Sequence, residues 1–109
     1  MATRFSQVRS VAPALVEQRL APRHRVQLMR EAQTADLPAQ EVLLHDVSSY
    51  GCRVEGHADV AAGERLWLRL AAGAPTASTV VWRDGAQIGC RFDEPIDRGL
   101  MRALTRAIR

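Results

Sequence analysis

Six short segments in which apolar and polar residues alternate constrain the fold of this chain more than any other feature. Across residues 66–70, Leu66, Leu68 and Leu70 share one face while Trp67 and Arg69 share the other, as in a strand with one buried side. Turn-forming residues separate these segments, which is typical of small all-β proteins. The expected strands cover residues 25–30, 41–45, 52–55, 66–70, 78–83 and 86–92.

The dipeptide Asp84-Gly85, between the last two of these segments, is the strongest local turn signal in the chain. It predicts a tight hairpin in which both central residues have positive φ. A six-stranded sheet that closes on itself leaves no exposed edges. We therefore predict a mainly β fold, namely a six-stranded antiparallel β-barrel.

A C-terminal α-helix is expected over residues 96–109. Pro95 suits its first turn and Asp97 suits the positive end of the helix dipole. One face is apolar and should cap the barrel or dock on another subunit, whereas a second, basic face is interpreted as solvated rather than as a surface for an acidic partner. The apolar face carries Ile96, Leu100, Leu104 and Ile108, and the basic face carries Arg98, Arg102, Arg106 and Arg109.

The length of 109 residues suits one domain. Residues 1–17 mix polar and scattered apolar side chains around Pro13, and we expect a flexible N-terminal segment, with the barrel domain and its helix over residues 18–109. The apolar run at 11–16 is too short for a signal sequence or a membrane span. We therefore expect a cytoplasmic protein that does not insert into membranes.

The net charge of +3 suits an anionic ligand but is too small to argue for nucleic acid. All fifteen basic residues are arginine, so the pattern Arg-x-x-x-Arg occurs four times and means little by itself. Only the pair Arg19 and Arg23 lies just before the first expected strand. Its position, and not its pattern, makes this pair a candidate.

The stretch from Asp46 to Gly51 joins the second and third expected strands and places a carboxylate, a hydroxyl and a glycine at one bend. A carboxylate accepts hydrogen bonds, the Ser48 hydroxyl donates or accepts, and a glycine leaves its backbone bare, so that a ligand can come close to it. The stretch indicates a corner that binds a polar ligand. The alternative is an ordinary turn with a glycine at positive φ.

Together, Arg19-Leu20-Ala21-Pro22-Arg23 and Asp46-Val47-Ser48-Ser49-Tyr50-Gly51 resemble the two motifs of the PilZ domain, the bacterial cyclic di-GMP receptor. These motifs are Arg-x-x-x-Arg followed by Asp/Asn-x-Ser-x-x-Gly, and residues 88–92 resemble the last strand of the family. The resemblance covers about residues 18–109. It implies a PilZ-type barrel that binds cyclic di-GMP through Arg19, Arg23, Asp46, Ser48 and Gly51.

Three residues near this site leave alternatives open. The resemblance links the residue before the first arginine to ligand stoichiometry, which Gln18 leaves undecided. Arg25 would replace Arg23 if the first strand began earlier. Trp82 either stacks on a base or packs within the sheet, and packing is the commoner role of a strand tryptophan.

We expect no enzymatic activity and no cofactor or metal. Strand alternation should point His45 and Asp46 to opposite faces, which rules out a triad with Ser48. Cys52 and Cys90 lack metal-ligand spacing and should be buried thiols.

The expected function is a cyclic di-GMP receptor that signals to a protein effector by ordering its N-terminal segment, and a homo-oligomer is compatible with this function. The alternatives are a protein-interaction module without nucleotide or, less favoured, a nucleic-acid binder.

Overall fold

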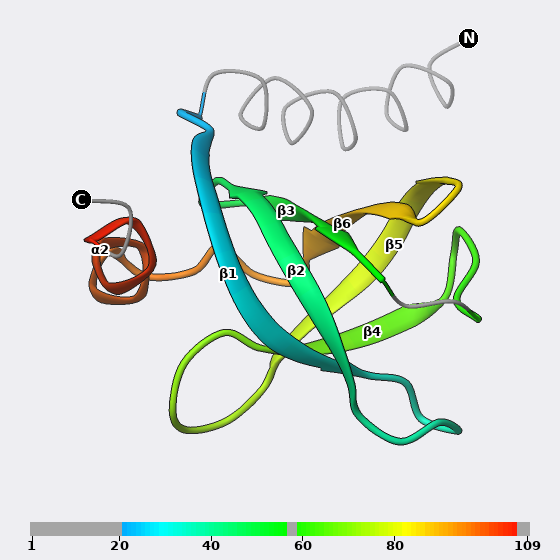
Figure 1. Cartoon of the computed structure of the whole chain (residues 1–109). Coiled ribbons are helices and arrows are strands. Elements are labelled where there is room, and N and C mark those ends of the chain that lie inside the picture. Colours follow the sequence, from blue (N-terminus) through cyan, green and yellow to red (C-terminus); the bar gives the residue numbers. More distant parts are fainter. Residues whose placement is uncertain (1–20, 57–58, 107–109) are drawn as a thin grey trace, which may run out of the picture.

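The computed structural model describes residues 21–56 and 59–106, which form six strands and one helix (Figure 1). The predicted N-terminal segment, Gln18 and Arg19 lie outside the described residues. The strands are β1 (His24–Gln33), β2 (Gln40–Val47), β3 (Gly51–Glu55), β4 (Arg65–Arg69), β5 (Thr76–Asp84) and β6 (Gln87–Phe92), and the helix is α2 (Arg98–Arg106).

The strands form a closed barrel in the order β1-β2-β3-β6-β5-β4, with every neighbouring pair antiparallel. β1 closes it because this ten-residue strand pairs with β2 and, through residues Glu31, Ala32 and Gln33, also with β4. The predicted six-stranded antiparallel barrel with a C-terminal helix is confirmed.

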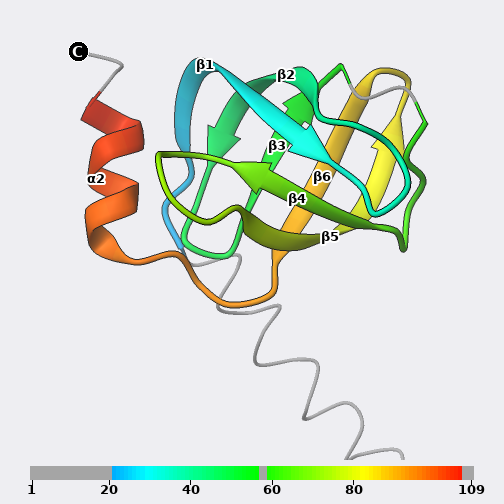
Figure 2. The same cartoon turned by 90° about the horizontal axis from the view of Figure 1, so that it is seen from below.

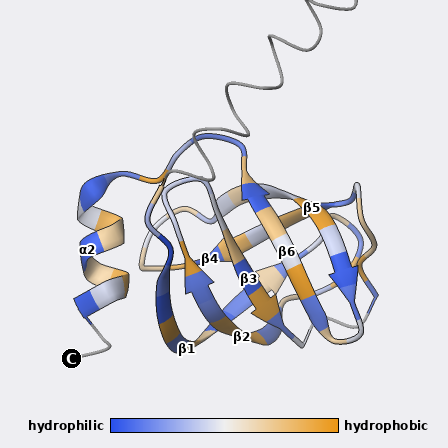
Figure 3. Ribbon diagram, turned by 90° about the horizontal axis from the view of Figure 1, so that it is seen from above, coloured by the Kyte–Doolittle hydropathy of each residue, from blue (hydrophilic) through white to orange (hydrophobic). Residues whose placement is uncertain are grey.

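The core fills the barrel interior, and the strands show the banding of apolar and polar residues that the sequence predicts (Figure 3). In β4, Leu66 and Leu68 are fully buried while Arg65 and Arg69 are exposed. Burial of such side chains supplies most of the stabilising free energy of a small barrel. The core consists of Val26, Ala32, Val42, Leu44, Val47, Cys52, Val54, Val60, Leu66, Leu68, Leu70, Val80, Ile88, Cys90, Phe92 and Leu104.

Helix α2 packs its apolar face on its own barrel, beside β1 (Figure 2). Leu104 is buried in the core, and Leu100 packs against it. The helix begins at Arg98 rather than at 96, because Asp97 Oδ1 accepts a hydrogen bond from the Leu100 backbone N–H at 2.7 Å and so caps the first turn. Among the described residues, no helix is long and apolar enough to span a bilayer.

The hairpin between β5 and β6 forms where it was predicted, but its turn is Gly85-Ala86 rather than Asp84-Gly85. Asp84 ends β5 and pairs with Gln87, and Gly85 has a φ of 61°. No described non-glycine residue has positive φ, so the expectation that both central residues of this turn have positive φ is wrong. Glycine in the first central position, followed by a residue at negative φ, matches a type II′ turn.

Candidate functional site

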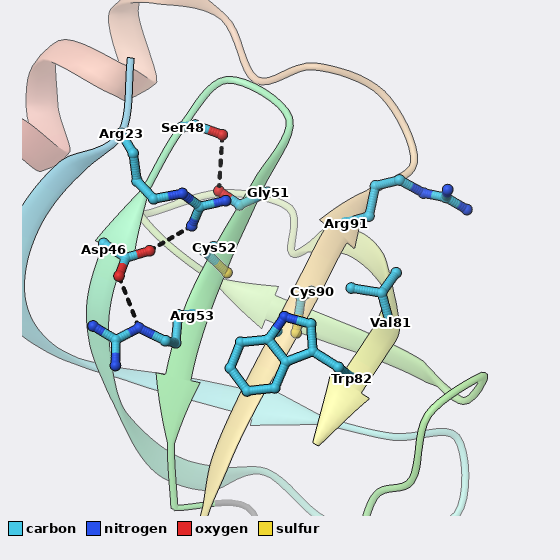
Figure 4. A pocket seen from close by; sticks show the side chains of 11 residues that line it. Arg23, Asp46, Ser48, Gly51, Cys52, Arg53, Val81, Trp82, Cys90 and Arg91 are labelled. Carbon is cyan, nitrogen blue, oxygen red and sulfur yellow. Dashed lines mark hydrogen bonds and ion pairs between the residues drawn. The ribbon is translucent and has the colours of Figure 1, made fainter. Parts of the chain in front are cut away.

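A pocket of about 420 Å³ opens on the outer wall of the barrel, at the end where the chain enters β1 (Figure 4). Four of the five predicted site residues line it, and the fifth, Arg19, lies outside the described residues. Arg25 is exposed on β1 and does not line the pocket, whereas Arg23 does. The lining residues are Arg23, Asp46, Ser48, Gly51, Cys52, Arg53, Val81, Trp82, Gly89, Cys90 and Arg91.

A β-bulge in β2 turns Asp46 toward this pocket. Leu44 pairs with Val54 and Asp46 pairs with Arg53, so His45 is an extra residue that has no opposite residue on β3 in the ladder. Strict alternation would have pointed Asp46 into the core with Leu44. The bulge reverses the alternation and places the carboxylate on the outer face beside Arg53, as bulges do near functional sites.

Both oxygens of the Asp46 carboxylate are held by arginines. Arg23 Nη1 donates to Oδ1 at 2.5 Å, and Arg53 Nε donates to Oδ2 at 2.8 Å (Figure 4). Arg53 Nη1 in turn donates to Gln87 Oε1 at 2.5 Å. Asp46 is only 7% exposed, so these two guanidinium groups offset the cost of burying its charge. The two motifs described in the sequence, residues 19–23 and residues 46–51, therefore meet through the contact between Arg23 and Asp46.

The bulge also corrects the argument against a triad. His45 Nε2 lies 2.6 Å from Glu55 Oε1, and Asp46 bonds to Arg53, two residues before Glu55 on the same strand. Residues 53 and 55 share one face of β3. His45 and Asp46 therefore lie on the same face, and the expectation of opposite faces is wrong because the extra residue breaks the alternation.

The bend itself is shorter than predicted, because Asp46 belongs to β2 and Gly51 to β3. The Ser48 backbone N–H donates to the Gly51 carbonyl at 2.8 Å, and Ser48 Oγ accepts from the Tyr50 N–H at 3.2 Å. Ser48 is buried, and its hydroxyl serves the turn.

Gly51 is needed because another strand passes close to it. Its φ is not positive, so the alternative of a turn glycine at positive φ is wrong. A Cβ at this position would lie 2.3 Å from the Cys90 carbonyl oxygen on β6. Glycine alone lets β3 and β6 approach this closely.

A tryptophan forms the opposite wall of the pocket. A second bulge, in β5, lies between Val80 and Trp82, and the Trp82 ring lies against the bare backbone of Gly89 on β6. A Cβ on Gly89 would be 2.1 Å from Trp82 Nε1. Trp82 is 43% exposed, so one side of its ring remains available to a ligand.

Arg53, Gly89 and Arg91 also line the pocket, and none of them was predicted from the sequence. Arg53 was recognisable in principle, since it lies between the inward-facing Cys52 and Val54 and therefore faces outward beside the motif. The described lining contains three arginines and one carboxylate, and two of the arginines, Arg23 and Arg53, contact that carboxylate. This surplus of positive charge suits an anionic ligand.

The two cysteines are free, buried and opposite each other on β3 and β6. A hydrogen bond with Cys90, together with burial, raises the pKa of the Cys52 thiol, and the same hydrogen bond lowers the pKa of Cys90. The described residues contain no cluster of three His, Cys, Asp or Glu side chains that could hold a metal ion.

A closed six-stranded antiparallel barrel with a C-terminal helix and an arginine-rich pocket on its outer wall defines a small ligand-binding or adaptor module of the PilZ type. A model of the PilZ domain matches residues 17–109, and the chain belongs to this family.

Among solved structures, the barrel is similar to the Bacillus subtilis inhibitor of motility, MotI/DgrA, with a TM-score of 0.54 and 17% sequence identity. The similarity covers 83% of this chain and 49% of that protein, so the present chain matches about half of its length. At this identity the likeness concerns the fold. No curated protein matches the sequence.

Proposed function

We propose that this chain is a cyclic di-GMP receptor that binds its ligand in the pocket around Asp46. The observation that carries the proposal is the contact between Arg23 and Asp46, residues 23 positions apart that belong to the two separate PilZ motifs. Their convergence on one pocket is what a shared ligand requires. Family membership supports the ligand class.

The lining residues match the chemistry of a cyclic dinucleotide. Arg23 and Arg91 have planar guanidinium groups that donate bidentately to phosphate oxygens or to the O6 and N7 atoms of guanine. Asp46 accepts hydrogen bonds from guanine N–H groups. The exposed side of the Trp82 ring offers a stacking surface for a base, and Arg19 would add a further donor from the preceding segment.

Ligand binding changes the partner of Arg23. Arg23 donates to Asp46 in the structure, and it lies immediately before β1. When a guanine takes over Asp46 Oδ1, Arg23 turns to the phosphate and carries the preceding residues with it. The N-terminal segment then orders over the ligand and presents a changed surface to a protein effector.

Isothermal calorimetry with cyclic di-GMP tests the proposal on the wild-type chain and on Arg23→Ala and Asp46→Asn. Each substitution is expected to weaken binding by about tenfold or more, since each removes a hydrogen bond that involves a charged group. Arg25→Ala is the matched control, because Arg25 is exposed and does not line the pocket. Equal affinity in all four proteins would remove this pocket from consideration.

One observation favours a second candidate, a PilZ module that binds a protein but no nucleotide. Asp46 and Ser48 already have partners within the chain, so the motif also makes sense as structural chemistry. This candidate predicts no heat with cyclic di-GMP, cyclic di-AMP or GTP. It also predicts that Asp46→Asn lowers thermal stability.

A further inference from the structure

We propose that Arg53 is a positioning residue that fixes Asp46 for reading a guanine edge, and so sets the preference for guanine over adenine. The inference rests on the proposed function and concerns a residue outside both PilZ motifs. Arg53 lies directly opposite Asp46 in the β2–β3 ladder. Its side chain reaches Asp46 on one side and Gln87 on the other.

The two arginines that hold Asp46 differ in how they are anchored. Arg53 belongs to a strand in the barrel wall, is tied to β2 and β6 at once, and its side chain is 31% exposed. Arg23 precedes the first strand, and its side chain is 52% exposed. A ligand can therefore displace Arg23 at low cost, whereas Arg53 keeps its bond to Oδ2.

A fixed Oδ2 determines where Oδ1 points once Arg23 has left. The Watson–Crick edge of guanine presents two adjacent N–H donors, at N1 and N2, to a carboxylate held in this position. Adenine presents an acceptor at N1, which repels a carboxylate oxygen placed there. If Arg53 is absent, Asp46 follows Arg23 instead, and guanine loses its advantage.

Calorimetry with cyclic di-GMP and cyclic di-AMP on Arg53→Gln, Arg53→Lys, Gln87→Ala and Arg65→Gln tests this role. Arg53→Gln is expected to lose about tenfold in affinity for cyclic di-GMP and much less for cyclic di-AMP, so that selectivity narrows. Arg53→Lys is expected to keep part of the selectivity for cyclic di-GMP that Arg53→Gln loses. Gln87→Ala leaves the ion pair between Arg53 and Asp46 intact. It is expected to lower the affinity for cyclic di-GMP and to narrow the selectivity by a smaller factor than Arg53→Gln. Arg65 pairs with Asp93 outside the pocket, and its substitution leaves both affinities unchanged.

A double variant separates positioning from direct contact. Once Asp46→Asn has removed the carboxylate, Arg53→Gln is expected to cause no further loss of affinity. A full additional loss would mean that Arg53 touches the ligand itself and would overturn the positioning role. Wild-type binding with unchanged selectivity in Arg53→Gln would overturn this inference alone, and absence of wild-type binding would overturn the proposed function with it. Thermal melts identify variants that are unfolded. If Arg53→Gln is unfolded, the selectivity of Gln87→Ala decides whether Arg53 has the positioning role.

Discussion

The contact between Gly51 and β6 predicts that Gly51→Ala destabilises the fold itself. The new Cβ would lie 2.3 Å from the Cys90 carbonyl oxygen, against a limit of 3.0 Å, so β3 and β6 must separate by at least about 0.7 Å. That movement stretches the hydrogen bond from Phe92 N to Tyr50 O beside the β3–β6 ladder and disturbs the bond from Ser48 N to Gly51 O in the β2–β3 turn, which are both 2.8 Å long. Each contributes about 1 kcal/mol, and with lost packing we expect a cost of about 2–3 kcal/mol.

Urea denaturation followed by circular dichroism measures this cost. Gly99→Ala is the matched control, because its Cβ would meet only Asp97 Oδ1, at 3.3 Å, in the first turn of α2. In a helix, alanine is favoured over glycine by about 0.5–1 kcal/mol, which offsets the small shift that the 3.3 Å contact demands of Asp97, so this variant should be as stable as the wild type. A Gly51→Ala protein within about 0.5 kcal/mol of the wild type would refute the reasoning.

Three further predictions concern the bulge, the tryptophan and the thiols. Deleting His45 should restore strict alternation and bury Asp46 without its arginines. We expect this deletion to lower the free energy of unfolding by about 3 kcal/mol or more, measured by chemical denaturation. Deleting Ala72, which lies in an exposed loop, is the control and should be tolerated. Gly89→Ala should push the indole off β6 at a cost of about 1 kcal/mol, and should cost nothing when Trp82 is already alanine. Above pH 9.0, the ordinary thiol pKa, Cys52 keeps its proton in the folded chain and loses it in the unfolded chain, so the free energy of unfolding should fall as the pH rises. Replacing both cysteines with alanine should abolish that fall, and a fall that persists would assign it to other groups.

The sequence was sufficient to predict the barrel, because its core depends on alternation that is visible in single segments. The buried face formed by Leu66, Leu68 and Leu70 can be recognised from this segment alone, and Gly85 indicates the turn of the hairpin between β5 and β6. Burial of apolar side chains is a local property of each strand, so each segment could be interpreted separately.

The site could be predicted only in part, because its geometry depends on register between strands. The extra residue at His45 is invisible until β2 is paired with β3, and it decides which way Asp46 faces. The role of Arg53 depends on the same pairing. Gly51 was expected to leave room for a ligand, whereas the group that approaches it in the structure is the backbone of β6, which lies some forty positions away in the sequence.

The Trp82 ring on Gly89 gives the molecule a built-in optical reporter. The chain has only two tryptophans, and Trp67 lies on β4, away from the pocket lining. Replacing Trp67 with phenylalanine would leave one indole, half in solvent, at the mouth of the pocket. Its emission would then respond to whatever enters the pocket, so occupancy could be followed in the otherwise unlabelled chain at concentrations far below those that calorimetry needs.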